Sequence, residues 1–450
     1  MKKPPPKAPA LDPFSDKRII LAIFAVALFT RLLHSSVLWV EEAYPTAAAL
    51  NILAGRSLYA DFWFDKPPLF PLLYTLWGAQ TGALLRIAGA TYITLCAWLM
   101  ARVAGNWLAG ALLAFFLIFD VPAASMVLGP DLLTLAPVLG AVLLRQRPMA
   151  AGALLALGFH VNTKAVLFLP LLWSGQAVVS FVLVAAPAFL MSGYLEQVWR
   201  WGALYAQDSF LDSPWREGLA KTAGWLGFHA ALVLAATRAK WDRLQLLWLG
   251  AALLCAFAGL RFFPRYYFHL LPPLCWLASQ ALISGSRWGR FARYRWALLA
   301  LLLIPLIRYA PGYWRPERSK DLAMFRDARQ AAKVIDEQAG PGDTLFTWGY
   351  RPEIDALSRL PGGTPFLESQ PVTGVFADRH LSSSRPSAHP AQTAAQLQRL
   401  AASKPIFLVD GLGRYNPELA ITKVPALAEW LKQYEVVAIT RGTVIYRLRR

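Results

Sequence analysis

Long apolar runs separated by short polar or basic segments fill the first two thirds of the chain. A helix needs about 20 mostly apolar residues to cross a bilayer. The pattern predicts about 11 membrane-spanning helices, and the short runs between residues 148 and 192 leave the number open by one or two. The predicted spans are residues 19–39, 84–100, 107–119, 132–144, 150–161, 165–173, 178–191, 222–236, 244–260, 267–283 and 296–307.

The pattern changes after residue 307 to that of a soluble segment. Three short runs rich in β-formers predict strands at residues 343–349, 404–411 and 435–449. Helical patterns alternate with them at residues 391–402 and 417–433, and an apolar stripe from Leu322 to Ile335 predicts a further helix capped by Ser319. This alternation predicts a small α/β domain.

The expected fold is mainly α, a polytopic transmembrane helix bundle followed by a C-terminal soluble α/β domain. Residues 1–18 are expected to form a basic, proline-rich, disordered arm. Residues 19–308 form the predicted membrane region, with a first outer loop at residues 41–82 that contains interfacial helices. Residues 309–450 form the predicted soluble domain.

Composition and charge agree with a membrane protein. The chain is 56% hydrophobic and 16% charged, whereas soluble domains carry about 25% charged residues. The net charge of +18 does not indicate nucleic acid, because the basic clusters fall in alternate loops and follow the positive-inside rule. This orientation predicts a multi-pass membrane protein with a cytoplasmic N-terminus and a C-terminal domain on the non-cytoplasmic side.

The first outer loop, "VEEAYPTAAALNILAGRSLYADFWFDKPPL" at residues 40–69, concentrates charge beside the membrane. Charged groups at that depth cost free energy, so a cluster of them favours a functional site over a simple mark of the water boundary. Two prolines after Lys66 prevent a continuous helix and fix the entry into the next apolar piece. The charged residues of the cluster are Glu41, Glu42, Asp61, Asp65 and Lys66.

The acidic pair and the Asp-Lys-Pro-Pro-Leu motif at residues 65–69 resemble the first outer loop of polytopic GT-C glycosyltransferases. This class includes lipid A aminoarabinose transferases and protein O-mannosyltransferases. Many relatives have Asp where this chain has Glu41. "SMVLGPDLL" around Asp131 and "GLRFFPRYYFHLLPPL" around Arg265 are similar to further family patterns, although His is common at the position of Arg265.

The resemblance implies a polyprenyl-phosphate sugar donor and transfer to an acceptor hydroxyl on a lipid, a glycan or a protein. The departing phosphate is already a stable anion, so the site needs a carboxylate base and cations rather than a general acid. Glu41 is the expected base, and Glu42 or Asp65 would orient the acceptor. The other expected substrate-binding residues are Asp61, Lys66, Lys164, Arg261, Arg265 and Tyr266.

Two basic residues in or next to the predicted spans have more than one possible role. Lys164 could lie at the end of a span and extend its amine to the interface. Arg31 could brace neighbouring helices or touch the lipid phosphate, and we favour bracing.

No metal is assigned, because Glu41 and Glu42 lack the one-residue gap of a DxD motif; the sequence leaves a divalent metal open. Cys96, Cys255 and Cys275 lie in apolar runs and are expected to act as small hydrophobic residues. The alternative function is a polytopic transporter of a lipid-linked or anionic substrate. Transporters usually place charges at the bilayer midplane and show paired halves, whereas this chain has its acids at one surface.

Overall fold

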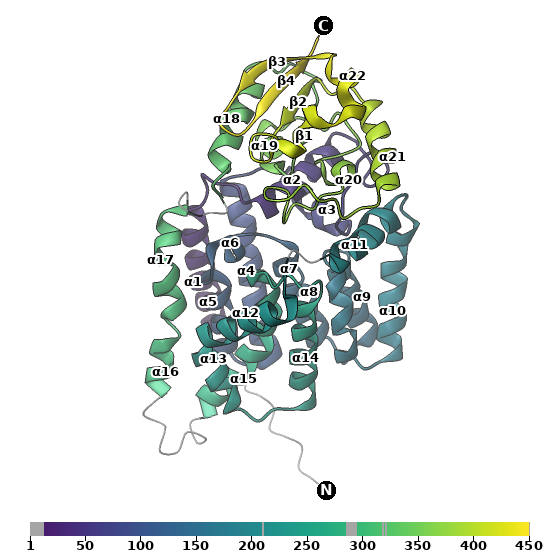
Figure 1. The fold of residues 1–450 in the computed structure, drawn as a ribbon. Helices are drawn as coiled ribbons and strands as arrows, with labels where there is room; N and C mark the ends of the chain where they lie inside the picture. The colour runs from purple at the N-terminus through teal and green to yellow at the C-terminus, as the bar shows by residue number, and fades with distance from the viewer. Residues whose placement is uncertain (1–12, 209–210, 285–294, 317–318, 320–321, 450) are drawn as a thin grey trace. The chain divides into compact units, whose positions relative to one another are not determined.

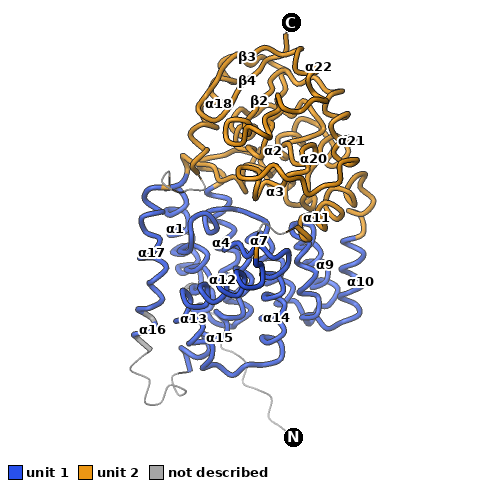
Figure 2. The backbone as a smooth tube through the Cα atoms, viewed as in Figure 1, with its two compact units in different colours: residues 1–34, 86–185, 213–315 blue, residues 35–85, 186–212, 316–450 orange. Residues whose placement is uncertain are grey.

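The computed structural model describes residues 13–208, 211–284, 295–316, 319 and 322–449. Contacts divide the chain into two compact units, which Figure 2 shows in different colours. Most of the predicted N-terminal arm and of the basic loop around Arg290 lies outside the described residues. Unit 1 consists of residues 1–34, 86–185 and 213–315, and unit 2 consists of residues 35–85, 186–212 and 316–450.

The described residues of unit 1 form helices joined by turns and loops, without a strand (Figure 1). Polar caps fix several helix starts: Asn106 accepts the amide of Ala109 at 3.0 Å, and Asp242 forms a reciprocal capping box with Gln245. Its elements are α1 (Pro13–Leu32), α4 (Ala83–Ala104), α5 (Trp107–Ile118), α6 (Pro122–Ser125), α7 (Pro130–Leu133), α8 (Leu135–Leu143), α9 (Pro148–Phe159), η1 (Thr163–Leu171), α10 (Gly175–Ala185), α12 (Pro214–Phe228), α13 (Ala230–Thr237), α14 (Arg243–Phe257), η4 (Pro264–Leu270), α15 (Leu271–Ser284), α16 (Arg295–Leu301) and α17 (Ile304–Trp314).

Small residues let these helices approach closely. A Cβ atom on Gly152 of α9 would lie 2.1 Å from the carbonyl oxygen of Ala177 in α10. A Cβ atom on Gly89 of α4 would lie 2.4 Å from the guanidinium of Arg31. A larger side chain at Gly152 would therefore force α9 and α10 apart, and one at Gly89 would displace the Arg31 guanidinium.

The predicted membrane spans correspond to helices, but their crossing of a bilayer stays a prediction. Among the described residues, one helix, α4, is long and apolar enough to cross a membrane. The number of such spans rises to 3 if each of two bent helix pairs forms one span. Those pairs are residues 175–207, bent by 104°, and residues 214–237, bent by 80°.

Unit 2 joins the first loop, residues 41–82, to the C-terminal segment. Its N-terminal elements are α2 (Val40–Leu53) and α3 (Leu69–Thr75), followed by η2 (Ala186–Leu190), a π-helical turn η3 (Leu195–Arg200) and α11 (Trp201–Gln207). The C-terminal elements are α18 (Phe325–Asp336), β1 (Leu345–Trp348), α19 (Pro352–Ser358), α20 (Gln370–Thr373), α21 (Pro390–Ala401), β2 (Phe407–Asp410), η8 (Pro417–Leu419), η9 (Ile421–Lys423), η10 (Pro425–Leu427), α22 (Ala428–Leu431), β3 (Tyr434–Ile439) and β4 (Val444–Leu448).

The C-terminal strands form one four-stranded sheet in the order β1-β2-β4-β3. β1 and β2 are parallel, with Leu345 opposite Phe407, whereas β4 is antiparallel to both β2 and β3. Alternate side chains of each strand face opposite sides of a sheet. Both sides are covered here, which explains why all residues of β1 and β2 are buried.

Two apolar cores lie on the two sides of the sheet. One contains Leu345 and Phe407 packed against Ala328 and Ile335 of α18. The other contains Phe346, Trp348 and Leu408, and it includes Trp63 from the first loop and Trp201 from α11. The first loop is therefore part of the same hydrophobic core as the C-terminal sheet.

The predicted α/β character of the C-terminal segment is confirmed, with two corrections. The region 417–433, predicted as one helix, is a series of short turns ending in α22, because Pro417 and Pro425 each start a new turn. The helix predicted to start at Ser319 begins at Phe325 as α18. The strands and α21 lie where the sequence pattern places them.

Candidate active site

The acidic pair of the first loop lies in the first turn of α2. The helix begins at Val40, so Glu41 and Glu42 are helical, whereas the sequence pattern predicts a shorter interfacial helix from Ala47 to Ala54. Carboxylates in the first turn interact favourably with the positive end of the helix dipole. Glu42 is fully buried, whereas Glu41 is partly exposed. α2 ends before Gly55, whose φ of +84° suits glycine.

Asp65 and Lys66 form an ion pair. The amine of Lys66 lies 2.6 Å from the Asp65 carboxylate, with side-chain exposures of 38% and 18%. The hydroxyl of Tyr59 donates to the carbonyl of Lys66 at 2.7 Å and so holds the backbone there. The substrate contact expected of Lys66 stays a prediction.

Asp61 has a local structural partner in the loop. Its carboxylate accepts the amide of Ser57 at 2.7 Å, which stabilises the turn between them. The substrate contact expected of Asp61 stays a prediction.

Arg56 connects the loop to the C-terminal segment. Its guanidinium donates to the side-chain oxygen of Asn51 at 2.6 Å and to the carbonyls of Gly362 and Thr364 at 2.7 and 2.6 Å. Asn51 also accepts the amide of Gly362 at 2.9 Å. These contacts bring residues 362–368 beside the loop that carries Asp65.

Glu368 is a buried carboxyl in this region that the sequence analysis did not identify. It lies in an irregular segment with no motif around it. Its pKa is raised to about 8: burial and the charge of Asp65 raise it, while the Gln370 backbone hydrogen bond lowers it. Buried carboxyls with raised pKa values are frequent at functional sites, which makes Glu368 a candidate.

A second polar cluster lies in unit 1 around Asp131. Pro130 occupies the first turn of α7 and places Asp131 at the helix start, where its side chain is 2% exposed. The carboxylate lies 3.7 Å from the amine of Lys164 and 3.6 Å from the guanidinium of Arg265. His269 lies 3.8 Å away. Two cations around one carboxylate leave a net positive charge that suits an anion.

Local secondary structure positions the members of this Asp131 cluster. The side chain of Asn162 caps η1 by accepting the amide of Lys164 at 3.1 Å and donates to Asp131 at 3.2 Å. η4 carries Arg265 and Tyr266. The amine of Lys164 lies 3.2 Å from the centre of the Tyr266 ring, a cation–π contact. The structure thus brings together three of the predicted substrate-binding residues: Lys164, Arg265 and Tyr266.

The other buried arginines of unit 1 contact backbone carbonyls. Arg261 is fully buried and donates to the carbonyl of Gly259 at 3.0 Å. Arg31 donates to the carbonyls of Ser125 and Met126 at 2.6 and 2.7 Å, as the bracing role predicts. The expected role of Arg261 in phosphate binding stays a prediction.

The predicted site residues fall on both units. Unit 2 carries the carboxylates Glu41, Glu42, Asp61 and Asp65 together with Lys66, and unit 1 carries Lys164, Arg261, Arg265 and Tyr266. Their predicted convergence in one crevice stays a prediction. Among the described residues, no three His, Cys, Asp or Glu side chains are placed to hold a metal ion.

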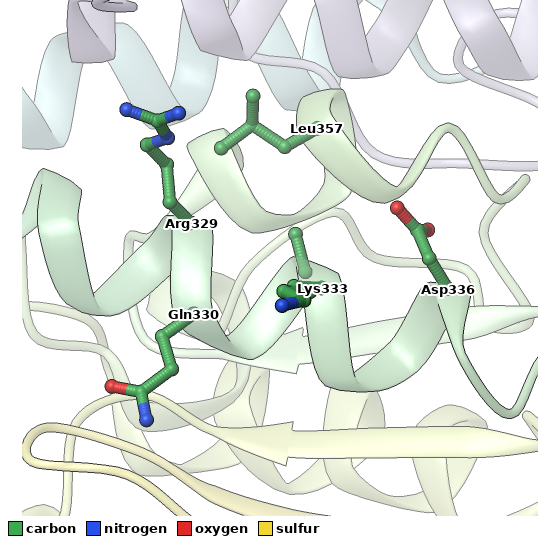
Figure 3. A pocket seen from close by; sticks show the side chains of 6 residues that line it. Arg329, Gln330, Lys333, Asp336 and Leu357 are labelled. Atoms are coloured by element: carbon green, nitrogen blue, oxygen red, sulfur yellow. The ribbon is translucent and has the colours of Figure 1, made fainter.

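Two cavities lie elsewhere. Figure 3 shows a pocket of about 440 Å³ beside α18, lined by Arg329, Gln330, Ala332, Lys333, Asp336 and Leu357, none of which is a predicted site residue. A cavity of about 420 Å³ in unit 1 is lined almost wholly by apolar side chains of α1, α5, α17 and the residues next to them. Such a lining is suited to hydrocarbon.

The fold resembles that of solved GT-C glycosyltransferases. ArnT from Cupriavidus metallidurans bound to undecaprenyl phosphate aligns with a TM-score of 0.58 at 17% identity, over 97% of this chain and 98% of that chain. Its apo structure aligns with a TM-score of 0.54 at 16% identity, over 96% and 98%. No protein-family model and no curated sequence matches the chain. At this identity the similarity shows the fold, and it confirms the resemblance to lipid A aminoarabinose transferases at that level.

Proposed function

We propose that the protein is a membrane glycosyltransferase that moves a sugar from a polyprenyl-phosphate donor to an acceptor hydroxyl. The observation that carries the proposal is the positively charged cluster of Lys164 and Arg265 around Asp131, in a fold similar to that of an ArnT structure that holds undecaprenyl phosphate. Similarity of fold alone would not define an activity. The cluster adds a group of side chains suited to a lipid phosphate.

In this proposal Lys164 and Arg265 neutralise the phosphate of the donor. Arg265 offers several N–H donors, and the contact of Lys164 with Tyr266 limits the directions in which its amine points. Asp131 keeps both side chains in place and leaves one positive charge in excess. Tyr266 would also contact the donor, and Lys66, Asp61 and Arg261 would supply further substrate contacts.

The carboxylates of the first loop act on the acceptor. Glu41, at the partly exposed start of α2, accepts the proton of the acceptor hydroxyl while that oxygen forms the new glycosidic bond. The bond between the sugar and the phosphate breaks, and the phosphate leaves as an anion. Glu42 or Asp65 orients the acceptor. The acceptor is a lipid, a glycan or a protein, and the reaction takes place on the outer face of a bacterial inner membrane.

The apolar cavity between α1 and α17 is consistent with a lipid-borne donor. It is large enough for several isoprene units, and Phe29, Leu306 and Trp314 are among the residues that line it. We assign it to the hydrocarbon chain of the donor or of a membrane lipid.

The test compares envelope glycolipids and glycans, by mass spectrometry, in cells with and without the gene. We expect one sugar-sized mass increment to disappear with the gene and to return with the wild-type gene. The Glu41→Gln variant should be inserted in the membrane and should bind undecaprenyl phosphate, but should not restore the increment. Glu435→Gln, on an exposed position of β3, is the matched control and should restore it. An unchanged profile after gene deletion would overturn the proposal.

A further inference from the structure

Glu368 is a buried acid at the point where the C-terminal segment meets the first loop. Glu368 is 2% exposed, and one of its carboxyl oxygens accepts a hydrogen bond from the backbone amide of Gln370 at 2.5 Å. A carboxylate buried in this way loses the solvation that stabilises its charge. The neutral acid is therefore the favoured form at neutral pH.

Backbone hydrogen bonds bring the segments that carry Glu368 and Asp65 side by side. The amide of Trp63 donates to the carbonyl of Pro365 at 2.9 Å, and Arg56 holds the adjacent carbonyl of Thr364 at 2.6 Å. Asp65 lies two residues beyond Trp63, and Glu368 lies three residues beyond Pro365. The backbone pairing thus places the segment of Glu368 beside the segment of Asp65, and the charge of Asp65 raises the pKa of Glu368.

The groups that act on Glu368 come from three elements. The charges of Asp65 and Lys66 in the first loop shift its pKa, and Gln370 at the start of α20 donates its backbone amide to it. Tyr44 of α2 completes the surroundings. Its ring packs between Phe64, with ring centroids 4.8 Å apart, and Tyr350, with centroids 5.4 Å apart. Lys66 is the one cation among these neighbours of Glu368.

We propose that Glu368 is a positioning residue for the Asp65–Lys66 pair, which it holds in place as a neutral carboxylic acid. The inference rests on the proposed function, because it assigns Asp65 and Lys66 to the substrate site. With Glu368 neutral, Lys66 has one anionic partner, Asp65, at 2.6 Å. When Glu368 ionises, it repels Asp65 and competes for Lys66, so the pair loses its geometry.

The pH profile of sugar transfer tests this role. The assay measures the sugar-sized product in membranes that contain wild-type or variant protein, between about pH 6 and 10. Wild-type activity should fall with a midpoint near pH 8, the pKa of Glu368. Glu368→Gln, which mimics the neutral acid, should retain at least half of the neutral-pH activity and lose this alkaline fall. Glu368→Ala should be at least tenfold less active at every pH.

Glu429→Gln is the matched control, because its side chain is 84% exposed, and it should follow the wild-type profile. If Glu368→Gln keeps the wild-type alkaline fall, or Glu368→Ala equals the control, the role of Glu368 is overturned while the proposed function stands. If no variant and no wild-type sample forms product, the proposed function itself fails.

Infrared spectroscopy of the purified protein tests the protonation without any substrate. The protonated-carboxyl absorption of wild type should exceed that of Glu368→Gln, and this excess should disappear with a midpoint near pH 8. The difference between wild type and variant isolates Glu368 from other buried acids such as Asp355. Spectra of wild type and variant that do not differ would overturn the neutral acid at residue 368, whatever the activity.

Discussion

The amine of Lys164 lies 3.7 Å from the carboxylate of Asp131. The two residues are 33 positions apart in the sequence, one at the start of α7 and the other in η1. Burial favours the neutral amine of a lysine, whereas a nearby carboxylate favours its charged form. The contact with Asp131 therefore stabilises the charged form of Lys164 relative to an isolated buried lysine.

Removal of this cation should weaken phosphate binding. We expect Lys164→Met to raise the Kd for undecaprenyl phosphate about tenfold or more, because a charge-assisted contact contributes about 1.5–3 kcal/mol. Titration of the purified protein in detergent measures the change. Lys432→Met, at a side chain that is 71% exposed, should leave the Kd unchanged. Equal affinities for the two variants would exclude Lys164 from the phosphate site.

Loss of Asp131 should cost stability. Asp131→Asn removes the carboxylate that lies near Lys164, Arg265 and His269. Leaving buried cations without their partner costs about 3–5 kcal/mol. Thermal unfolding in detergent should show a Tm lowered by several degrees. The exposed Glu429→Gln variant should unfold as the wild type does, and an unchanged Tm for Asp131→Asn would contradict the ion-pair account.

Arg56 should hold the first loop onto the C-terminal segment. Arg56→Ala removes hydrogen bonds to Asn51, Gly362 and Thr364 and should destabilise unit 2 by about 2–3 kcal/mol. Hydrogen exchange should increase in residues 57–65 and 361–366. Arg200→Ala, at a side chain that is 76% exposed, provides the control. Unchanged exchange in both segments would show that other contacts hold the loop.

A pH-dependent loss of stability should come from Asp355. This residue is buried in the C-terminal domain, and burial raises its pKa to about 8 from an ordinary value near 4. In the unfolded chain the Asp355 carboxyl loses its proton above about pH 4. In the folded protein it keeps this proton up to about pH 8. Across that window, rising pH favours the unfolded state, by on the order of 1 kcal/mol per pH unit.

Asp355→Asn cannot release this proton. Its stability relative to wild type should therefore increase as the pH rises from about 5 to 8 and then level off. Chemical unfolding curves at several pH values measure the difference. A constant difference between variant and wild type across this range would exclude a raised pKa at Asp355.

Much of the candidate site could be found from the sequence, because charged residues in an apolar chain are conspicuous. Glu41, Glu42, Asp65 and Lys66 stand out by their density beside an apolar run. Lys164 and Arg265 stand out as cations next to apolar segments, and the structure places both beside Asp131. Glu368 could not be found in this way, because its segment is polar and a single acid there is ordinary.

Local physics explains which elements the sequence determined. Short β-branched and aromatic runs in the C-terminal segment specify strands, and four strands form there. Prolines 417 and 425 interrupt the helix expected between residues 417 and 433. The start of α2 at Val40 was missed, because its acidic first turn also suits a loop at a water boundary.

By itself, the sequence determined where helices and strands occur and which charges an apolar chain retains, since both depend on neighbouring residues. Only the tertiary structure decided that the first loop shares a core with the C-terminal sheet, through Trp63 and Trp201. It also placed the segment of Glu368 beside the first loop, through the hydrogen bond between Trp63 and Pro365. These relationships depend on contacts between segments some 300 residues apart. No local pattern encodes such contacts, because burial and charge pairing arise only when distant segments pack together.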